Sequence, residues 1–225
     1  MGTPVKEIQQ AAGTLASDLP GVVVASVPVP APGEAGEMVG LVRREVALCA
    51  QHRNPRRRTE FVAGRNAARM AVARLLGSST VHDIEILKDA TGAPFVVDHP
   101  RVRVSITHSN QVAVAVAAFV PVGVDLEADE ARPAGFSRMF FSPHEQASMS
   151  AAPDDARQTM LNTLWTRKEA ICKVGRWGSS LAFAALDCLD TDVRVADAAI
   201  TVKSASAAGY VLSIAAEKKD LSEDG

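Results

Sequence analysis

The chain has 225 residues, of which 47% are hydrophobic and 22% are charged, so it is long enough to bury a core and too apolar to be a disordered protein. A formal net charge of −2 at pH 7 excludes a general attraction to nucleic acid or to acidic membranes. The sequence shows no signal-peptide pattern and no apolar run long enough to span a bilayer, so we expect a cytoplasmic protein.

The first half of the chain predicts a strand, a long helix and several short strands. A Val-rich strand is expected at residues 21–27, and a Pro/Gly-rich loop at residues 28–36 follows it. Thr59 is a candidate N-cap for a helix over residues 59–76, which Gly77 would end. Further strands are expected at residues 83–88, 94–97, 102–107 and 112–120.

The second half repeats this order of elements. A strand at residues 122–127 precedes a polar segment, 128–158, in which prolines separate short helical pieces. A second long helix is expected over about residues 158–174. Two or three strands then follow, at residues 186–194, 198–203 and 209–216. One long helix plus several strands in each half favours an α+β fold and hints at two similar halves that meet near residue 120.

Two carboxylates lie close together in Gly-Val-Asp-Leu-Glu, residues 123–127. Positions i and i+2 of a strand project from the same face, so Asp125 and Glu127 are expected side by side. Glu169, on the second predicted helix, is a third carboxylate that could converge with them. Carboxylate oxygens suit Mg²⁺, and acidic residues crowded beside cations are typical of a metal–polyphosphate site.

Each long helix also carries a cation where its apolar stripe should continue. Arg65 lies one turn after Phe61 in the first helix, and Lys168 interrupts the stripe of the second. Arg65 either extends to the helix edge or pairs with an anion. Glu169 and Lys173, four residues apart on one side of the second helix, form either an ordinary helix ion pair or part of a ligand site. Two such helices favour an anion held between them. His108, at the end of a strand, is either structural or part of the same site, and the sequence contains no HxxxH, HxH or CxxC pattern that would indicate zinc.

Five motifs in this region resemble the signatures of the 4′-phosphopantetheinyl transferases. Residues 123–127 and the stretch Trp-Thr-Arg-Lys-Glu-Ala-Ile-Cys-Lys, residues 165–173, resemble G-[IV]-D-x-E and W-x-x-K-E-A-x-x-K. Residues 57–69 are similar to R-x-x-E-F-x-x-x-R-x-x-A-R of the Sfp-type and enterobactin-type members. Residues 105–109 are similar to S-[IL]-[ST]-H-[SC], and residues 141–145 to F-[FS]-x-x-E. The order and spacing of the motifs, and the chain length, resemble the monomeric, duplicated type.

This resemblance implies a pseudo-twofold α+β fold in which each half packs a long helix on a small, mostly antiparallel sheet. Residues 1–118 would supply the coenzyme A phosphate contacts, and residues 119–225 the metal site and the catalytic helix. The implied reaction transfers the 4′-phosphopantetheine arm of coenzyme A to a serine of an apo acyl or peptidyl carrier protein and releases 3′,5′-ADP. Polyketide or nonribosomal peptide biosynthesis is the implied setting, and a fatty-acid carrier protein is the alternative. The implied protein is a monomer that binds neither nucleic acid nor a membrane.

The resemblance also implies roles for individual residues. Mg²⁺ would be held by Asp125, Glu127 and Glu169. Coenzyme A would be bound by Arg57, Arg65, Lys88, His108, Lys168 and Lys173. Within that set, the two arginines match contacts to the 3′-phosphate, although the adjacent Arg58 is an alternative to Arg57, and the lysines at 168 and 173 would face the diphosphate. The catalytic residues would be Glu169, as the base, and Lys168.

One departure and two rival functions accompany this interpretation. Thr91-Gly-Ala-Pro94 has Ala93 where the family often has a lysine or arginine, which predicts the loss of one nucleotide contact. The first rival is a non-catalytic module that binds coenzyme A or a carrier protein, against which the intact carboxylates argue. The second is a nucleic-acid binder that uses residues 53–58, which the net charge and the lack of interleaved aromatic residues disfavour.

Overall fold

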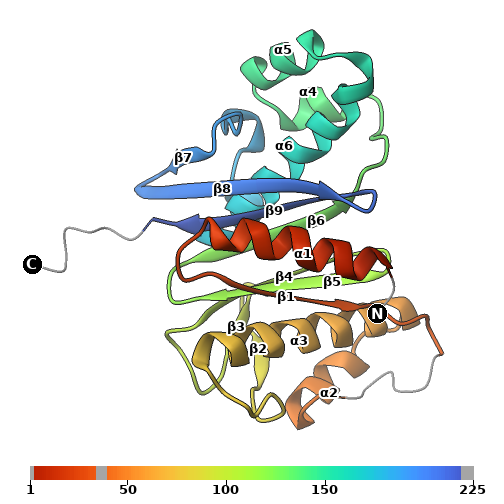
Figure 1. The fold of residues 1–225 in the computed structure, drawn as a ribbon, viewed down its shortest axis with the longest axis vertical. Helices are drawn as coiled ribbons and strands as arrows, with labels where there is room; N and C mark the ends of the chain where they lie inside the picture. The colour runs from red at the N-terminus through yellow and green to blue at the C-terminus, as the bar shows by residue number, and fades with distance from the viewer. Residues whose placement is uncertain (1–2, 34–39, 219–225) are drawn as a thin grey trace, which may run out of the picture.

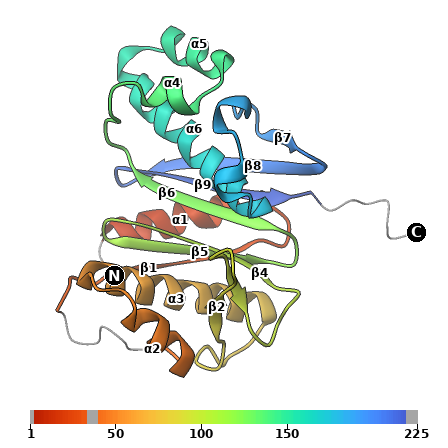
Figure 2. The same cartoon turned by 180° about the vertical axis from the view of Figure 1, so that it is seen from behind.

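The computed structural model describes residues 3–33 and 40–218 (Figures 1 and 2). The helices are α1 (Thr3–Ser17), α2 (Arg43–Ala50), α3 (Pro55–Leu76), α4 (Phe136–Phe140), α5 (Pro143–Ala151) and α6 (Asp154–Gly175). The strands are β1 (Val23–Pro28), β2 (Ile86–Lys88), β3 (Pro94–Val96), β4 (Arg103–Ser109), β5 (Val112–Ala118), β6 (Val122–Ala128), β7 (Asp192–Val195), β8 (Ala198–Ala207) and β9 (Tyr210–Glu217). Within these ranges no helix is both long and apolar enough to cross a membrane.

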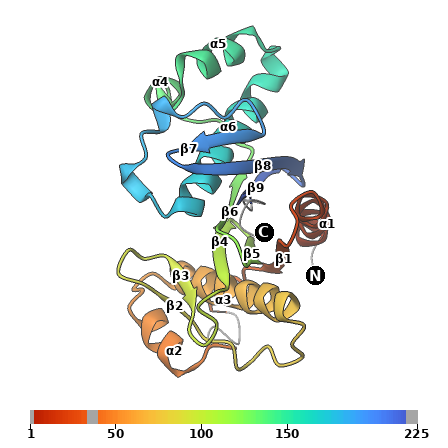
Figure 3. The same ribbon diagram turned by 90° about the vertical axis from the view of Figure 1, so that its left-hand side faces the viewer.

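The strands form two antiparallel sheets and a separate hairpin. The first sheet has the order β1-β5-β4, the second has the order β6-β9-β8-β7, and β2 pairs with β3. The α3 helix packs on the first sheet and α6 on the second. Figure 3 shows both sheets between these two helices, with α1 along one side.

The same arrangement occurs twice along the chain. In each half the first strand pairs with the last, β1 with β5 and β6 with β9, and the last pairs with the strand before it, β4 or β8. The long helix of each half, α3 or α6, has 22 residues. The prediction of an α+β fold, with two similar halves that each pack a long helix on an antiparallel sheet, is confirmed.

The α3 helix begins one turn earlier than the predicted start at Thr59. Asn54 is the N-cap, because its side chain accepts a hydrogen bond from the Arg56 N–H, and Pro55 occupies the first helical position. The basic residues that precede Thr59 therefore lie in the first turn of the helix. The predicted end is confirmed, since Gly77 is the C-cap in the left-handed conformation, with φ 63°.

Two helices and part of a strand differ from the sequence-based expectation. The α1 and α2 helices lie where no element was predicted, and β7 covers only the end of the strand expected at residues 186–194. Residues 34–36 of the predicted Pro/Gly-rich loop lie outside the described residues. The α1 helix buries one stripe, which packs on β1, β8 and β9, so it contributes to a core shared by both halves. That stripe consists of Val5, Ile8, Ala12 and Leu15.

The two halves meet where β4 lies beside β6. These strands belong to different sheets, and side chains of β4 bond to the backbone of β6. The Ser105 hydroxyl accepts from the Val124 N–H, and the Thr107 hydroxyl accepts from the Leu126 N–H, each at 3.2 Å. The two hydroxyls thereby fix β4 against the strand that carries the paired carboxylates.

Candidate active site

The β6 strand approaches α6 very closely at Gly123. A Cβ atom on this residue would lie 1.9 Å from the carbonyl oxygen of Ala170, so glycine is required for this approach. The close packing turns the two carboxylates of β6 toward the face of α6 that carries Glu169 and Lys173. The orientation of Asp125 and Glu127 toward α6 therefore depends on the close contact between Gly123 and the Ala170 carbonyl.

Asp125 is the most buried of the three predicted metal ligands, with 5% of its surface exposed. Its Oδ1 atom accepts from the Lys173 ammonium at 2.7 Å and from the Thr107 hydroxyl at 3.2 Å. Its Oδ2 atom is buried and has no hydrogen-bond partner within the described part of the chain. Burying a carboxylate oxygen without a partner costs free energy, so this oxygen is available to a hydrogen-bond donor or a cation.

Glu127 and Glu169 share the electrostatic environment of Asp125. Burial raises the pKa of Glu169, Asp125 and Glu127 raise it further, and Lys173 lowers it. Glu127 lies 3.3 Å from an Arg132 guanidinium nitrogen. Among the residues that the structure describes, no three His, Cys, Asp or Glu side chains are arranged as a metal centre. The carboxylates are thus coupled by charge and oriented toward cations, and the predicted metal remains a prediction.

A second group of charges, the cation cluster, consists of His52, Arg57, Arg65 and Lys88. Arg65 is 3% exposed, its guanidinium lies 4.5 Å from the centre of the Phe61 ring, and its Nε and Nη2 atoms have no hydrogen-bond partner in the described chain. Burial lowers the pKa of Arg65 to about 10. The pKa of Lys88 is lowered mainly by burial and less by the charge of Arg65. The pKa of His52 is lowered mainly by burial and less by the charges of the other three members of the cluster. Neighbouring positive charges therefore disfavour the charged forms of Lys88 and His52, as in a site that receives an anion.

His108 lies between the cation cluster and the carboxylates. Its Nδ1 atom is 3.8 Å from a Glu60 carboxylate oxygen, and the Arg57 guanidinium is 3.1 Å from the same oxygen. Burial lowers the pKa of His108; Glu60 opposes this, and smaller effects come from Arg57, Lys173 and Asp125. The charge of Arg57 acts on both histidines of this region.

A cavity of about 690 Å³ opens between the two halves. One wall is the β2–β3 turn, residues 91–94, together with β4 residues 103–106. The other wall is the C-terminal end of α6, including Glu169 and Lys173, and the residues that follow it. The cavity therefore brings Glu169 and Lys173 of the second half opposite the β2–β3 turn of the first half.

The predicted role of Lys168 is wrong. Its side chain is fully buried, and its ammonium lies 2.8 Å from a Glu145 carboxylate oxygen. It also donates to the carbonyl oxygen of Phe183 at 2.8 Å and to that of Leu186. An ammonium has three donors, so these three acceptors leave none for a diphosphate or a reacting group. Lys168 interrupts its apolar stripe because it pairs with an internal carboxylate.

The first half contains the same buried pair, which supports a structural role. Arg69 of α3 pairs with Glu45, and Arg69 and Lys168 occupy equivalent positions counted from the first residues of their helices. Each glutamate accepts the backbone N–H of the N-cap residue of a short helix, Val42 before α2 for Glu45 and Ser142 before α5 for Glu145. The remaining oxygen of each glutamate accepts a backbone N–H at 2.9 Å, from Ile86 or Cys188.

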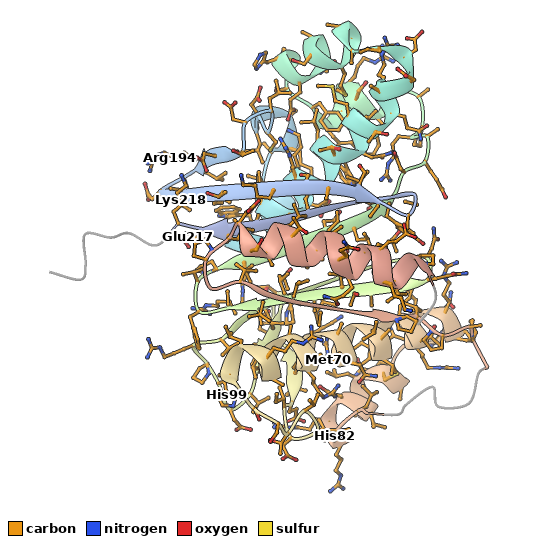
Figure 4. All side chains as sticks on the ribbon, viewed as in Figure 1. Met70, His82, His99, Arg194, Glu217 and Lys218 are labelled. Atoms are coloured by element: carbon orange, nitrogen blue, oxygen red, sulfur yellow. The ribbon has the colours of Figure 1, made fainter. Side chains whose placement is uncertain are left out.

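The two halves differ at the positions of the carboxylates. Arg74 donates to the Val24 carbonyl at 2.7 Å, as Lys173 donates to the Val124 carbonyl at 2.9 Å. Counted from these pairs, the first half has Ala25, Val27 and Met70 where the second has its three acidic residues. These three residues lie in an apolar cluster of the first half, and Figure 4 marks the methionine on α3. Only the second half therefore has carboxylates at these positions that could bind a metal ion or accept a proton.

His52 and Arg176 are not among the site residues predicted from the sequence. His52 forms no metal-ligand pattern, and only the fold brings it beside Arg65 and Lys88. Arg176 follows the second long helix and lines the cavity. A positive residue directly after a predicted helix was the one available signal for Arg176.

Comparisons with known proteins give related matches for both halves. The model of the 4′-phosphopantetheinyl transferase superfamily matches residues 121–215, and that of the 4′-phosphopantetheinyl transferase N-terminal domain matches residues 44–118. A holo-[acyl-carrier-protein] synthase of Chlorobaculum tepidum is 38% identical over 99 residues, which are 40% of this chain and 82% of the relative. Enzymes of the same name from Geobacillus sp. and Anoxybacillus flavithermus are 41% and 44% identical over 28% and 29% of this chain, which spans 59% and 61% of their lengths. The crystal structure of a Bacillus anthracis holo-(acyl-carrier-protein) synthase in complex with coenzyme A (3′,5′-ADP) is 27% identical, with a TM-score of 0.38 over 43% of this chain and 92% of that chain.

Proposed function

Because the chain belongs to the 4′-phosphopantetheinyl transferase superfamily, we propose that it transfers the 4′-phosphopantetheine arm of coenzyme A to a serine of a carrier protein and releases 3′,5′-ADP. The relatives named holo-[acyl-carrier-protein] synthase support this reaction. The carrier is an acyl or peptidyl carrier protein of polyketide or nonribosomal peptide biosynthesis.

One observation carries the proposal: the three carboxylates are coupled by charge beside the Lys173 ammonium, and Glu169 and Lys173 line the cavity between the two halves. Asp125, Glu169 and Lys173 lie on the second half, and Arg65 of the cation cluster lies on the first. Phosphoryl transfer depends mainly on charge neutralisation and positioning, so a site of this kind matches its requirements.

The chemistry of the donor set suits a magnesium ion. Asp125, Glu127 and Glu169 would hold it, since all are oxygen donors and the buried Oδ2 atom of Asp125 has no partner in the described chain. When bound, Mg²⁺ would neutralise phosphate oxygens of coenzyme A and make the phosphorus more electrophilic.

The protein's own side chains bind the substrate and move one proton. Arg57, Arg65, Lys88 and His108 bind the 3′-phosphate end of coenzyme A. Lys173 neutralises the diphosphate. Glu169 accepts the proton of the carrier serine as the serine oxygen bonds to the β-phosphorus and the bond from that phosphorus to the 3′,5′-ADP oxygen breaks. Burial and Asp125 raise the pKa of Glu169, which brings this carboxylate closer to the range of an effective base at neutral pH.

We further propose that the protein acts as a cytoplasmic monomer that binds no nucleic acid. Residues 1–118 form the half that binds the coenzyme A phosphates, and residues 119–225 the half that holds the metal and the base. The α1 helix packs on strands of both halves and joins them together with the β4–β6 contact.

Intact-protein mass spectrometry tests the function and identifies the carrier. Apo acyl and apo peptidyl carrier proteins are incubated with the full chain, coenzyme A and Mg²⁺. We expect one carrier class to gain the mass of the phosphopantetheine arm on its serine, with release of 3′,5′-ADP. Coenzyme A binding without any mass gain would support the non-catalytic binding module instead.

A further inference from the structure

The C-cap of α6 is an arginine in a backbone conformation that favours glycine. Arg176 has φ 54° and ψ 30°, and its N–H donates to two carbonyls of the last helical turn. Gly77 ends α3 in the same way, with φ 63°, ψ 24° and two equivalent bonds. Residues with a Cβ atom are disfavoured in this left-handed region. The fold therefore accepts glycine at this cap, and the side chain of Arg176 has another use.

The Arg176 guanidinium extends across the cleft to the other half of the molecule. Its Nη1 atom lies 2.6 Å from Asp89 Oδ2, and its Nη2 atom donates to the Pro94 carbonyl at 3.4 Å. The Oδ1 atom of Asp89 accepts from the Thr91 N–H, the Thr91 hydroxyl and the Ala93 N–H. One carboxylate thus organises the β2–β3 turn and orients the guanidinium beside it.

This arrangement lies within the cavity already described. Arg176 follows Lys173 by about one helical turn, and both residues line the wall opposite residues 91–94. Arg176 lines the cavity and its side chain is 35% exposed, so a ligand in the cavity can reach it. The turn itself carries no cation, because Ala93 stands between its glycine and proline.

We propose that Arg176 contacts the adenine nucleotide end of coenzyme A, and that Asp89 is a positioning residue for its guanidinium. This inference rests on the proposed function, because it names a residue for the substrate of that same site. A planar guanidinium both stacks on an aromatic base and donates to phosphate oxygens. Arg176 supplies from the C-cap of α6 the guanidinium donors that the turn lacks.

Calorimetric titration of 3′,5′-ADP and of coenzyme A into the full chain tests the assignment. Arg176→Gly preserves the left-handed cap, so we expect its melting temperature to be no lower than that of the parent protein. We expect its Kd for 3′,5′-ADP to rise about tenfold or more, the scale of one charge-assisted contact. Asp89→Asn keeps an acceptor oxygen for the turn, so its loss of affinity is smaller. Lys6→Ala removes a charge from α1, on the other side of the sheets from the β2–β3 hairpin (Figure 3), and leaves the Kd unchanged.

Steady-state kinetics separates a substrate contact from a structural role. A contact of this kind raises the KM for coenzyme A in Arg176→Gly with little change in kcat, since it acts on ground state and transition state alike. Parent-like binding by Arg176→Gly, or an equal loss in Lys6→Ala, overturns the assignment. If the parent chain binds neither ligand, the proposed function fails and this inference fails with it; if only the Arg176 variant behaves like the parent, the inference alone fails.

Discussion

Lys168→Met should reduce stability strongly and spare ligand binding. The substitution keeps the length of the buried side chain and removes its ammonium, which leaves Glu145 as a buried charge and deprives two carbonyl oxygens of their donor. Breaking a buried ion pair on one side costs about 3–5 kcal/mol. In a chain of this size each kcal/mol shifts the melting temperature by about 2–4 °C, so we expect a fall of about 6–20 °C.

The assay combines thermal melts with coenzyme A titration at a temperature where the variant is folded. Arg69→Met is the matched control, because it breaks the equivalent pair with Glu45 in the first half, at a position with no proposed ligand contact. Both variants should lose stability to a similar extent and keep their coenzyme A affinity. Unchanged stability together with lost affinity or turnover in Lys168→Met would refute the structural assignment and return this lysine to the active site.

Three further predictions concern the cation cluster, the close helix–strand contact and acid stability. Arg65→Met removes two buried nitrogens that have no partner in the described chain, so in urea melts it should be at least as stable as the parent. Calorimetry should show an affinity loss of about 10- to 100-fold for coenzyme A and little loss for 3′-dephospho-coenzyme A. Equal losses for both ligands would contradict a 3′-phosphate contact. Gly123→Ala would push β6 away from the Ala170 carbonyl, so denaturant melts should show a fall of about 3 kcal/mol in the free energy of unfolding. Parent-like stability together with full transfer activity would refute the tight contact. Burial raises the pKa of Asp187, but hydrogen bonds from a backbone N–H, a serine hydroxyl and a histidine ring outweigh it and hold the pKa below its usual value. This carboxylate therefore stabilises the fold above the unfolded-state pKa, and its contribution is lost as the pH falls through the folded-state pKa. Asp187→Asn should therefore reduce the fall in unfolding free energy between about pH 5 and pH 2. An unchanged dependence of stability on pH would exclude this contribution.

The sequence predicted the parts of the fold that local signals determine. The end of α3 at Gly77 and the alternating run that became β5 depend on turn chemistry and period, which are visible in single segments. The α1 stripe has helical spacing, yet the surface that it covers exists only after strands from both halves assemble. The α2 helix buries only Glu45 and Cys49, so it has no apolar stripe to indicate it.

The site could be predicted only in part, for a related reason. Asp125 and Glu127 follow from strand alternation, and Arg65 stood out on its apolar stripe. A buried cation interrupts such a stripe in the same way whether it faces a ligand or an internal carboxylate, so the sequence could not tell Arg65 from Lys168. The partner of Lys168 is brought to it by the packing of α5 on α6, which single-segment patterns do not encode.

Single-turnover transfer by Glu169→Gln tests most directly whether the carboxylates between β6 and α6 drive phosphopantetheine transfer. The variant keeps one oxygen donor and cannot accept a proton, and Glu130→Gln, an exposed neighbour of the site, is its matched control. With the carrier protein identified, product mass is followed across a Mg²⁺ titration. We predict a loss of about 10²–10⁴-fold in the rate for Glu169→Gln that excess Mg²⁺ does not restore, and a parent-like rate for the control. Rescue by Mg²⁺ to near the parent rate would contradict Glu169 as the base, and a parent-like rate without rescue would contradict the site itself.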